Sequence, residues 1–131
     1  MQTRLRRIGV GLAAALLAVT GVSVGTASSA SAASYTCGPS APDLDTKTSQ
    51  VIHPVSGYSG AAIRTGPGSN CPMLNNNNLR IPWNAWVDLN CFRHGQSVNG
   101  DDTWSAVHYA QWFGWVADYY LSNDGSSFNC G

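Results

Sequence analysis

The chain has 131 residues, and its seven basic and seven acidic side chains give a formal net charge of zero. Three arginines lie within the first seven positions, so the rest of the chain carries four basic against seven acidic groups, a net charge of −3. Nucleic acid and anionic membrane surfaces are bound by clustered Lys and Arg, so this balance argues against both partners. The length allows one small domain with a thin core.

The N-terminus predicts an export signal. Arginines at residues 4–7 precede a mostly apolar run at 8–24, and an Ala-Ser-Ala triplet follows at 30–32. This order is typical of a signal peptide, so we expect residues 1–32 to be removed and the protein to be secreted, remaining free or associated with the cell wall. A membrane anchor is the alternative, but several glycines interrupt the apolar run. The export route, general or twin-arginine, stays open.

Four cysteines follow the predicted signal: Cys37, Cys71, Cys91 and Cys130. An even number in a small exported domain predicts two disulfides. Of the three possible connectivities we expect Cys71 with Cys91, which flank neighbouring elements, and Cys37 with Cys130, because chain termini often lie close together. A zinc site would compete for these cysteines, but no C-x-x-C spacing is present, and we expect no metal.

The remaining chain predicts an irregular arm at residues 33–50 and a β-rich domain at 51–131. Residues 61–64 predict a short strand, and the Gly- and Pro-rich residues 65–69 a tight turn. The asparagines at 75–78 are typical of a solvated loop, since Asn tolerates left-handed backbone.

Residues 86–93 alternate as in a half-buried strand, with Val87, Leu89 and Cys91 on one face. The pair Asn99-Gly100 favours a type I′ hairpin turn before a strand at 104–109. No helical period appears after the signal. The sequence therefore predicts an all-β fold.

Three segments resemble bacterial SH3-like (SH3b) domains. They are Arg-Thr-Gly-Pro at 64–67, the strand at 104–107, and the Gly-Trp-Val strand at 114–121 that runs into a turn ending in Tyr-Leu. The resemblance spans residues 61–121. It implies a small β-barrel of about five short antiparallel strands with a one-turn 3-10 helix near the C-terminus, here stabilised by disulfides.

No catalytic constellation emerges. A Cys-His hydrolase would need a free thiolate, whereas every cysteine has a more plausible partner in another cysteine. His53, His94 and His108 are far apart in sequence, and Asp101 and Asp102 would point to opposite faces of a strand. We expect no catalytic residue and no cofactor.

The aromatic residues, five Trp and five Tyr, are the better indication of function. If Val107 and Val116 face the interior, then Trp104 and Trp115 point outward. Outward tryptophans could cap the barrel and cover the arm, or they could form a recognition groove with stacking platforms. Trp112, in an expected loop, fits a groove best.

The resemblance adds to this groove. Trp104 matches the groove Trp at the start of a middle strand, and Tyr120 the groove Tyr of the final helical turn. Ala117 stands where eukaryotic relatives have a groove Pro, which argues against recognition of Pro-rich helices. The predicted groove residues are Trp83, Trp104, Trp112 and Tyr120.

The leading expectation is therefore an exported, monomeric, non-catalytic module that binds a cell-envelope component such as a peptidoglycan peptide. Bacterial members of the family are commonly attached to wall-degrading enzymes as targeting modules. The alternative is a secreted protein-protein module, an inhibitor or effector that presents the loop at 93–102. A small hydrolase has the least support and would require a free, reactive cysteine.

Overall fold

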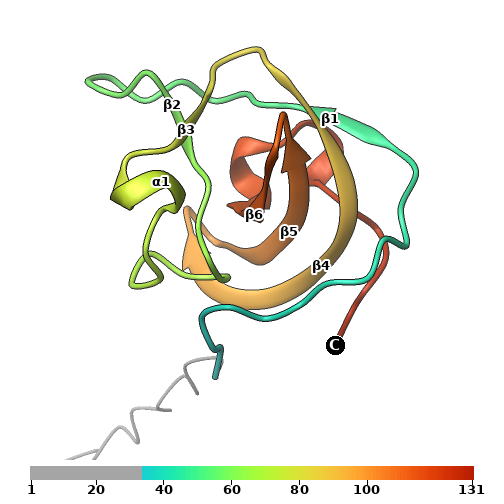
Figure 1. The fold of residues 1–131 in the computed structure, drawn as a ribbon. Coiled ribbons are helices and arrows are strands. Elements are labelled where there is room, and N and C mark those ends of the chain that lie inside the picture. Colours follow the sequence, from blue (N-terminus) through green and yellow to red (C-terminus); the bar gives the residue numbers. More distant parts are fainter. Residues whose placement is uncertain (1–33) are drawn as a thin grey trace, which may run out of the picture. The chain divides into compact units, whose positions relative to one another are not determined.

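The computed structural model describes residues 34–131 (Figure 1). Six strands dominate: β1 (Thr48–Gln50), β2 (Gly60–Ala62), β3 (Arg80–Pro82), β4 (Trp86–Val98), β5 (Asp101–Tyr109) and β6 (Trp112–Ala117). The other elements are one helical turn and two 3-10 turns: α1 (Leu74–Asn77), η1 (Asp118–Tyr120) and η2 (Ser122–Asp124). The all-β prediction is confirmed. The predicted signal peptide lies outside the described residues, among which no helix has the length and apolarity to cross a membrane.

The strands form two antiparallel sheets, one in the order β1-β4-β5-β6 and one of β2 with β3. Figure 1 shows β4 as a long strand bent around β5 and β6. Strand β1 lies in the segment expected to be an irregular arm and pairs with the start of β4. Arg64, which follows β2, connects the two sheets through Trp115 of β6. The backbone N–H of Arg64 donates to the Trp115 carbonyl at 2.9 Å, and the backbone N–H of Trp115 donates to the Arg64 carbonyl at 2.8 Å. Neither sheet closes on itself.

Two local predictions are confirmed by backbone geometry. Asn99 and Gly100 have φ of 50° and 91°, the pair of positive values that a type I′ turn requires. The turn α1 contains three consecutive asparagines, Asn75 to Asn77, with φ of 54°, 54° and 64°. This left-handed turn is possible because Asn bears that conformation at low cost.

A β-bulge at Asn90 divides β4. Leu89 pairs with Val107 but Cys91 pairs with Ala106, so Asn90 is an extra residue on the β4 side. The side-chain alternation shifts by one position at a bulge. The prediction that Cys91 shares a face with Leu89 is therefore wrong, because the two residues belong to different core clusters.

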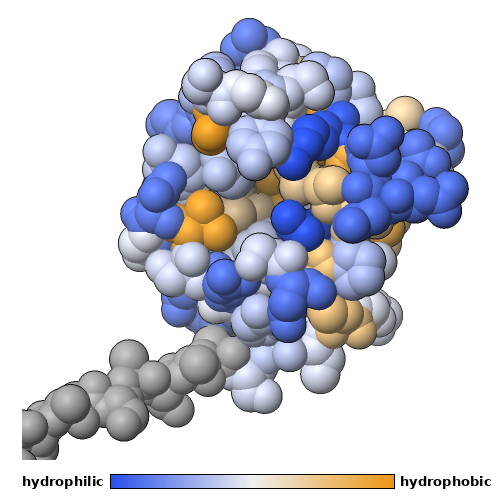
Figure 2. All heavy atoms as spheres, turned by 90° about the vertical axis from the view of Figure 1, so that its left-hand side faces the viewer, coloured by the Kyte–Doolittle hydropathy of each residue, from blue (hydrophilic) through white to orange (hydrophobic). Residues whose placement is uncertain are grey.

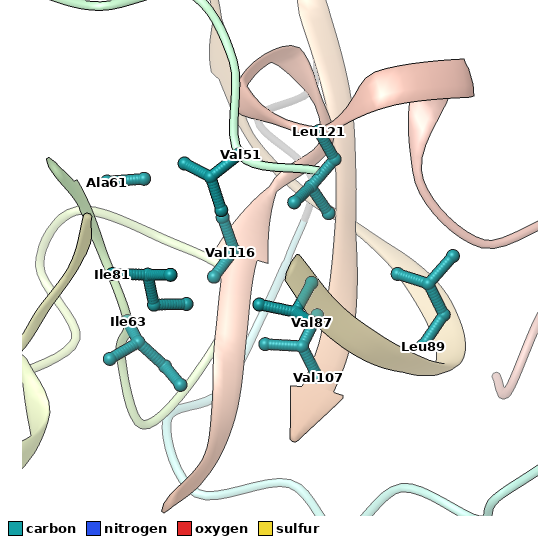
Figure 3. Close-up of a cluster of buried hydrophobic side chains, with 9 residues drawn as sticks. All are labelled: Val51, Ala61, Ile63, Ile81, Val87, Leu89, Val107, Val116 and Leu121. Carbon is teal, nitrogen blue, oxygen red and sulfur yellow. The ribbon is translucent and has the colours of Figure 1, made fainter. Parts of the chain in front are cut away.

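The first core cluster lies between the two sheets (Figure 3). It draws on the five strands β2 to β6 and on the segments next to them, and comprises Val51, Ala61, Ile63, Ile81, Val87, Leu89, Val107, Val116 and Leu121. Each of these side chains is at most 3% exposed. Burial of a Val, Leu or Ile side chain contributes about 1.5–3 kcal/mol, so this cluster is a main source of stability.

The second core cluster holds Trp104 and Trp115, which were expected to point outward from the barrel interior. They are only 3% and 1% exposed, so a solvent-exposed position is excluded for both rings. The predicted strand parity holds, because both residues lie in a different cluster from Val107 and Val116. Their face of the sheet is nevertheless covered, since Ala41 of the N-terminal arm and Cys130 of the C-terminal tail pack against this cluster, as do Val98, Phe113 and Tyr120.

All four cysteines form disulfides, but in a different pairing from the expected one. Cys37 pairs with Cys71 and Cys91 with Cys130, with Cα atoms 5.4 and 5.6 Å apart. The predicted pairs, Cys71 with Cys91 and Cys37 with Cys130, are wrong. Two disulfides are typical of a protein that folds in an oxidising, extracellular environment.

The arm and the tail explain the pairing. Gly38 N–H donates to the carbonyl of Thr65 at 2.7 Å, which holds Cys37 beside the turn that contains its partner. The tail runs along β4, where Cys130 N–H donates to the carbonyl of Phe92 at 3.0 Å. The arm therefore brings Cys37 next to Cys71, and the tail brings Cys130 next to Cys91.

Candidate functional site

A pocket of about 220 Å³ lies where β2 and β3 approach the ends of β4, β5 and β6. Figure 2 shows the side of the molecule that carries β2, β3 and α1, with a hollow in which apolar residues lie between strongly hydrophilic ones. The aromatic and charged residues that line the pocket are Tyr58, Arg64, Arg80, Trp83, Trp104 and Tyr120.

Three of the four predicted groove residues meet in this pocket: Trp83, Trp104 and Tyr120. Trp112 does not line it. Trp112 is the first residue of β6, opposite Tyr109, and packs half-buried against the first core cluster. The expectation that it lies in a loop is wrong, because the loop between β5 and β6 consists of residues 110–111 alone.

The two tryptophan rings of the pocket are fixed by hydrogen bonds to main-chain carbonyls. The indole N–H of Trp83 donates to the carbonyl of Tyr58 at 2.8 Å. The Trp83 and Tyr120 rings lie 6.0 Å apart with their planes tilted by 48°. Tyr58 is 54% exposed, whereas Trp104 is almost fully covered, so the rings lie at different depths of the pocket. Pre-positioned aromatic rings lose little conformational entropy when a ligand packs on them.

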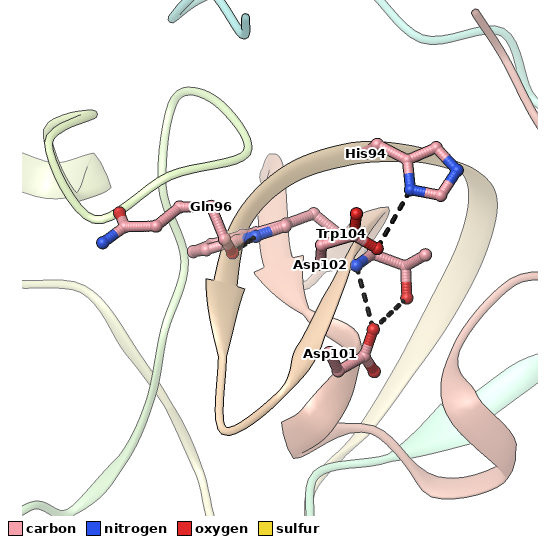
Figure 4. Close-up of polar contacts among 6 residues, drawn as sticks. His94, Gln96, Asp101, Asp102 and Trp104 are labelled. Atoms are coloured by element: carbon pink, nitrogen blue, oxygen red, sulfur yellow. Dashed lines mark hydrogen bonds and ion pairs between the residues drawn. The ribbon is translucent and has the colours of Figure 1, made fainter. Parts of the chain in front are cut away.

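Trp104 lies on β5 and is held by a hydrogen bond to the neighbouring strand β4 (Figure 4). The indole N–H of Trp104 donates to the carbonyl of Gln96 at 2.8 Å. Further along the ribbon, Asp102 accepts a 3.0 Å contact from His94, and Asp101 accepts hydrogen bonds from the backbone and hydroxyl of Thr103. These two adjacent acids therefore have separate structural partners.

Two arginines complete the pocket, and sequence reasoning missed their role. The guanidinium of Arg80 lies over the Tyr58 ring at 4.2 Å and donates from Nη1 to the carbonyl of Gly60 at 3.1 Å. Arg64 donates from Nη1 to the carbonyls of Ser69 and Cys71 at 3.0 and 2.9 Å. The sequence indicates Arg64 only as the end of a short strand and the start of the Arg-Thr-Gly-Pro motif. Its isolated position in a mostly apolar strand was the available signal.

The charge of these arginines is not balanced by an acid. No Asp lines the pocket, and His94 with Asp102 is the one ion pair within residues 34–131, the segment that holds all seven acidic residues. Burial lowers the pKa of Arg64 from its ordinary value, and the charge of Arg80 lowers it further. The pocket is therefore a local positive site in a segment whose net charge is negative.

Gly60 allows the close approach of strands that forms one side of the pocket. A Cβ atom at this position would overlap the backbone carbonyl of Ile81 on the paired strand β3. Any larger residue would push β2 from β3 and displace Arg80, whose guanidinium is bonded to the Gly60 carbonyl.

The described residues offer little for catalysis by a thiol or for metal binding. All four cysteines are in disulfides, so none is a free nucleophile. Residues 34–131 contain no group of three or more His, Cys, Asp or Glu side chains placed to hold a metal ion. Comparisons with protein-family profiles, with curated proteins and with solved structures gave no match.

Proposed function

We propose that this protein is an exported, non-catalytic binding module with an SH3-like fold that recognises a peptide of the bacterial cell wall. The observation that carries the proposal is the convergence of Trp83, Trp104 and Tyr120 on one pocket. Such a pocket, with a few fixed polar groups among aromatic rings, is typical of ligand-binding sites.

Two further observations support export to the envelope. The N-terminal sequence has the order of a signal peptide. The two disulfides require an oxidising environment to persist. The small β-rich domain also resembles wall-targeting modules in its Arg-Thr-Gly-Pro and Gly-Trp-Val segments.

Co-sedimentation tests the proposal. The oxidised chain without residues 1–32 is mixed with purified peptidoglycan or with cellulose as a control, beside the variant Trp83→Ala. We expect pelleting with peptidoglycan alone and a loss of about 1–3 kcal/mol of binding free energy in the variant, as for an interface hot spot. Failure of the wild type to pellet would reject wall recognition and favour a soluble protein partner bound through the β4–β5 ribbon.

A further inference from the structure

We infer that Arg64 and Arg80 bind a carboxylate of the ligand peptide in this pocket, an inference that rests on the proposed function. The guanidinium groups come from positions on either side of the 65–79 segment, and both residues line the same pocket. Guanidinium groups bind carboxylates through paired, charge-assisted hydrogen bonds.

Both arginines retain donors for a ligand. The hydrogen bonds to main-chain carbonyls use Nη1 in each case, and a guanidinium carries five N–H donors. Those carbonyl contacts also fix the direction of each side chain. The stacking of Arg80 on Tyr58 further restricts its position. The donors are thus held in place before a ligand arrives, which lowers the entropic cost of binding.

Electrostatics favour an anion at this point. Two like charges in a partly buried pocket, without an acidic neighbour, repel each other and lose hydration. That cost is visible in the lowered pKa of Arg64. An entering carboxylate relieves both effects, so the pocket prefers an anionic ligand over a neutral or cationic one.

The size and lining of the pocket restrict the ligand further. Drug-sized ligands occupy cavities of about 300–1,000 Å³, whereas this pocket has a volume of about 220 Å³. It fits one residue or a chain end. Ala61, Ala62 and Ala117 contribute small apolar surface beside the arginines, which suits a short aliphatic side chain next to the carboxylate.

Soluble probes test this inference without the wall. The chain without residues 1–32, labelled with ¹⁵N, is titrated with N-acetyl-Ala-Ala, which has a free C-terminal carboxylate, and with its C-terminal amide. N-acetyl-Ala-Glu-amide places the single carboxylate on a side chain instead. We expect at least one of the two carboxylate probes to shift the Trp83 indole resonance. The C-terminal amide of N-acetyl-Ala-Ala, which has no carboxylate, should bind at least tenfold more weakly. Equal binding of the amide would overturn the inference.

Variants identify the arginines. Arg80→Gln is preferred because Arg64 also holds the 65–71 turn. The matched control is Lys47→Gln, which removes the same charge from an exposed residue outside the pocket. We expect Arg80→Gln to weaken carboxylate binding about tenfold or more, and Lys47→Gln to leave it unchanged. Equal affinities of the two variants, both with wild-type thermal stability, would overturn the inference.

Chemical treatment of peptidoglycan separates this inference from the proposed function. Carbodiimide amidation removes wall carboxylates, and hydrofluoric acid removes phosphate polymers. We expect amidation to abolish pelleting and hydrofluoric acid to leave it unchanged. Pelleting that survives amidation would retain wall recognition but overturn the carboxylate assignment. If the wild type fails to pellet at all, the proposed function fails and the soluble probes alone decide.

Discussion

The guanidinium carbon of Arg80 lies 4.2 Å from the centre of the Tyr58 ring. This contact joins the two kinds of group that characterise the pocket, an aromatic surface and an unpaired positive charge. Because Tyr58 is largely exposed, its ring lines the pocket but contributes little to the packing of the core. Residues of this kind can be changed to test function without unfolding the protein.

Tyr58→Ala should weaken wall binding while it lowers the free energy of unfolding by only about 0.5–1 kcal/mol, the contribution of an exposed cation-π contact. The variant removes the ring but keeps the backbone carbonyl that accepts from Trp83. Tyr58→Phe retains a ring under Arg80 and serves as the control. Co-sedimentation and thermal denaturation measure the two effects, and a large loss of stability with intact binding would contradict the assignment.

Trp112→Ala should have the opposite profile. This side chain packs against the first core cluster and lies outside the pocket, so its removal leaves a partial cavity. We expect a loss of about 2 kcal/mol of stability and unchanged binding at a temperature where the variant is folded. Urea denaturation and co-sedimentation provide the readouts. Reduced affinity for peptidoglycan in a folded variant would show that Trp112 contributes to the binding surface.

The disulfide pairing can be checked by digestion with trypsin under non-reducing conditions. Cleavage after Lys47, Arg64, Arg80 and Arg93 places each cysteine in a separate fragment. We expect the fragment ending at 47 to be linked to 65–80, and 81–93 to be linked to 94–131. Mass spectrometry would instead find 65–80 joined to 81–93 if the pairing expected from the sequence were correct.

Asp118 should make stability depend on pH. Its side chain is 1% exposed, and its Oδ1 atom has no hydrogen-bond partner. Burial raises its pKa from 3.8 to about 7, and the nearby side chains of Ser105 and Thr103 oppose this shift only in part. Between about pH 4 and about pH 7 the Asp118 carboxyl group is therefore protonated in the native state but ionised in the unfolded state. This contribution to stability is therefore complete below about pH 4 and is lost as the pH rises towards about 7.

The variant Asp118→Asn removes this titration. Relative to the wild type, its free energy of unfolding should increase as the pH rises from about 4 to about 7, at up to about 1.4 kcal/mol per pH unit. Urea denaturation across this range measures the difference. Asp124→Asn, at an exposed position of η2, is the control and should follow the wild type. A difference between Asp118→Asn and the wild type that stays constant with pH would show that Asp118 does not titrate in this range.

Part of the candidate site was predictable from sequence. Trp83, Trp104 and Tyr120 were expected in a groove and line one pocket. The arginines were not recognised, because a single Arg in a strand is usually a solvated residue and nothing in the local pattern brings Arg64 near Arg80. Trp112 was placed in the groove because its neighbours suggested a loop, whereas pairing with Tyr109 extends the hairpin up to it.

The sequence by itself determined the features that depend on adjacent residues. These are the type I′ turn at Asn99-Gly100, the left-handed asparagine turn and the all-β character, each of which follows from backbone preferences and side-chain alternation. Only the tertiary structure decided the bulge at Asn90, the disulfide partners and the burial of Trp104 and Trp115. The physical reason is that these features depend on contacts between distant segments, above all the arm and the tail that cover the second face of the sheet.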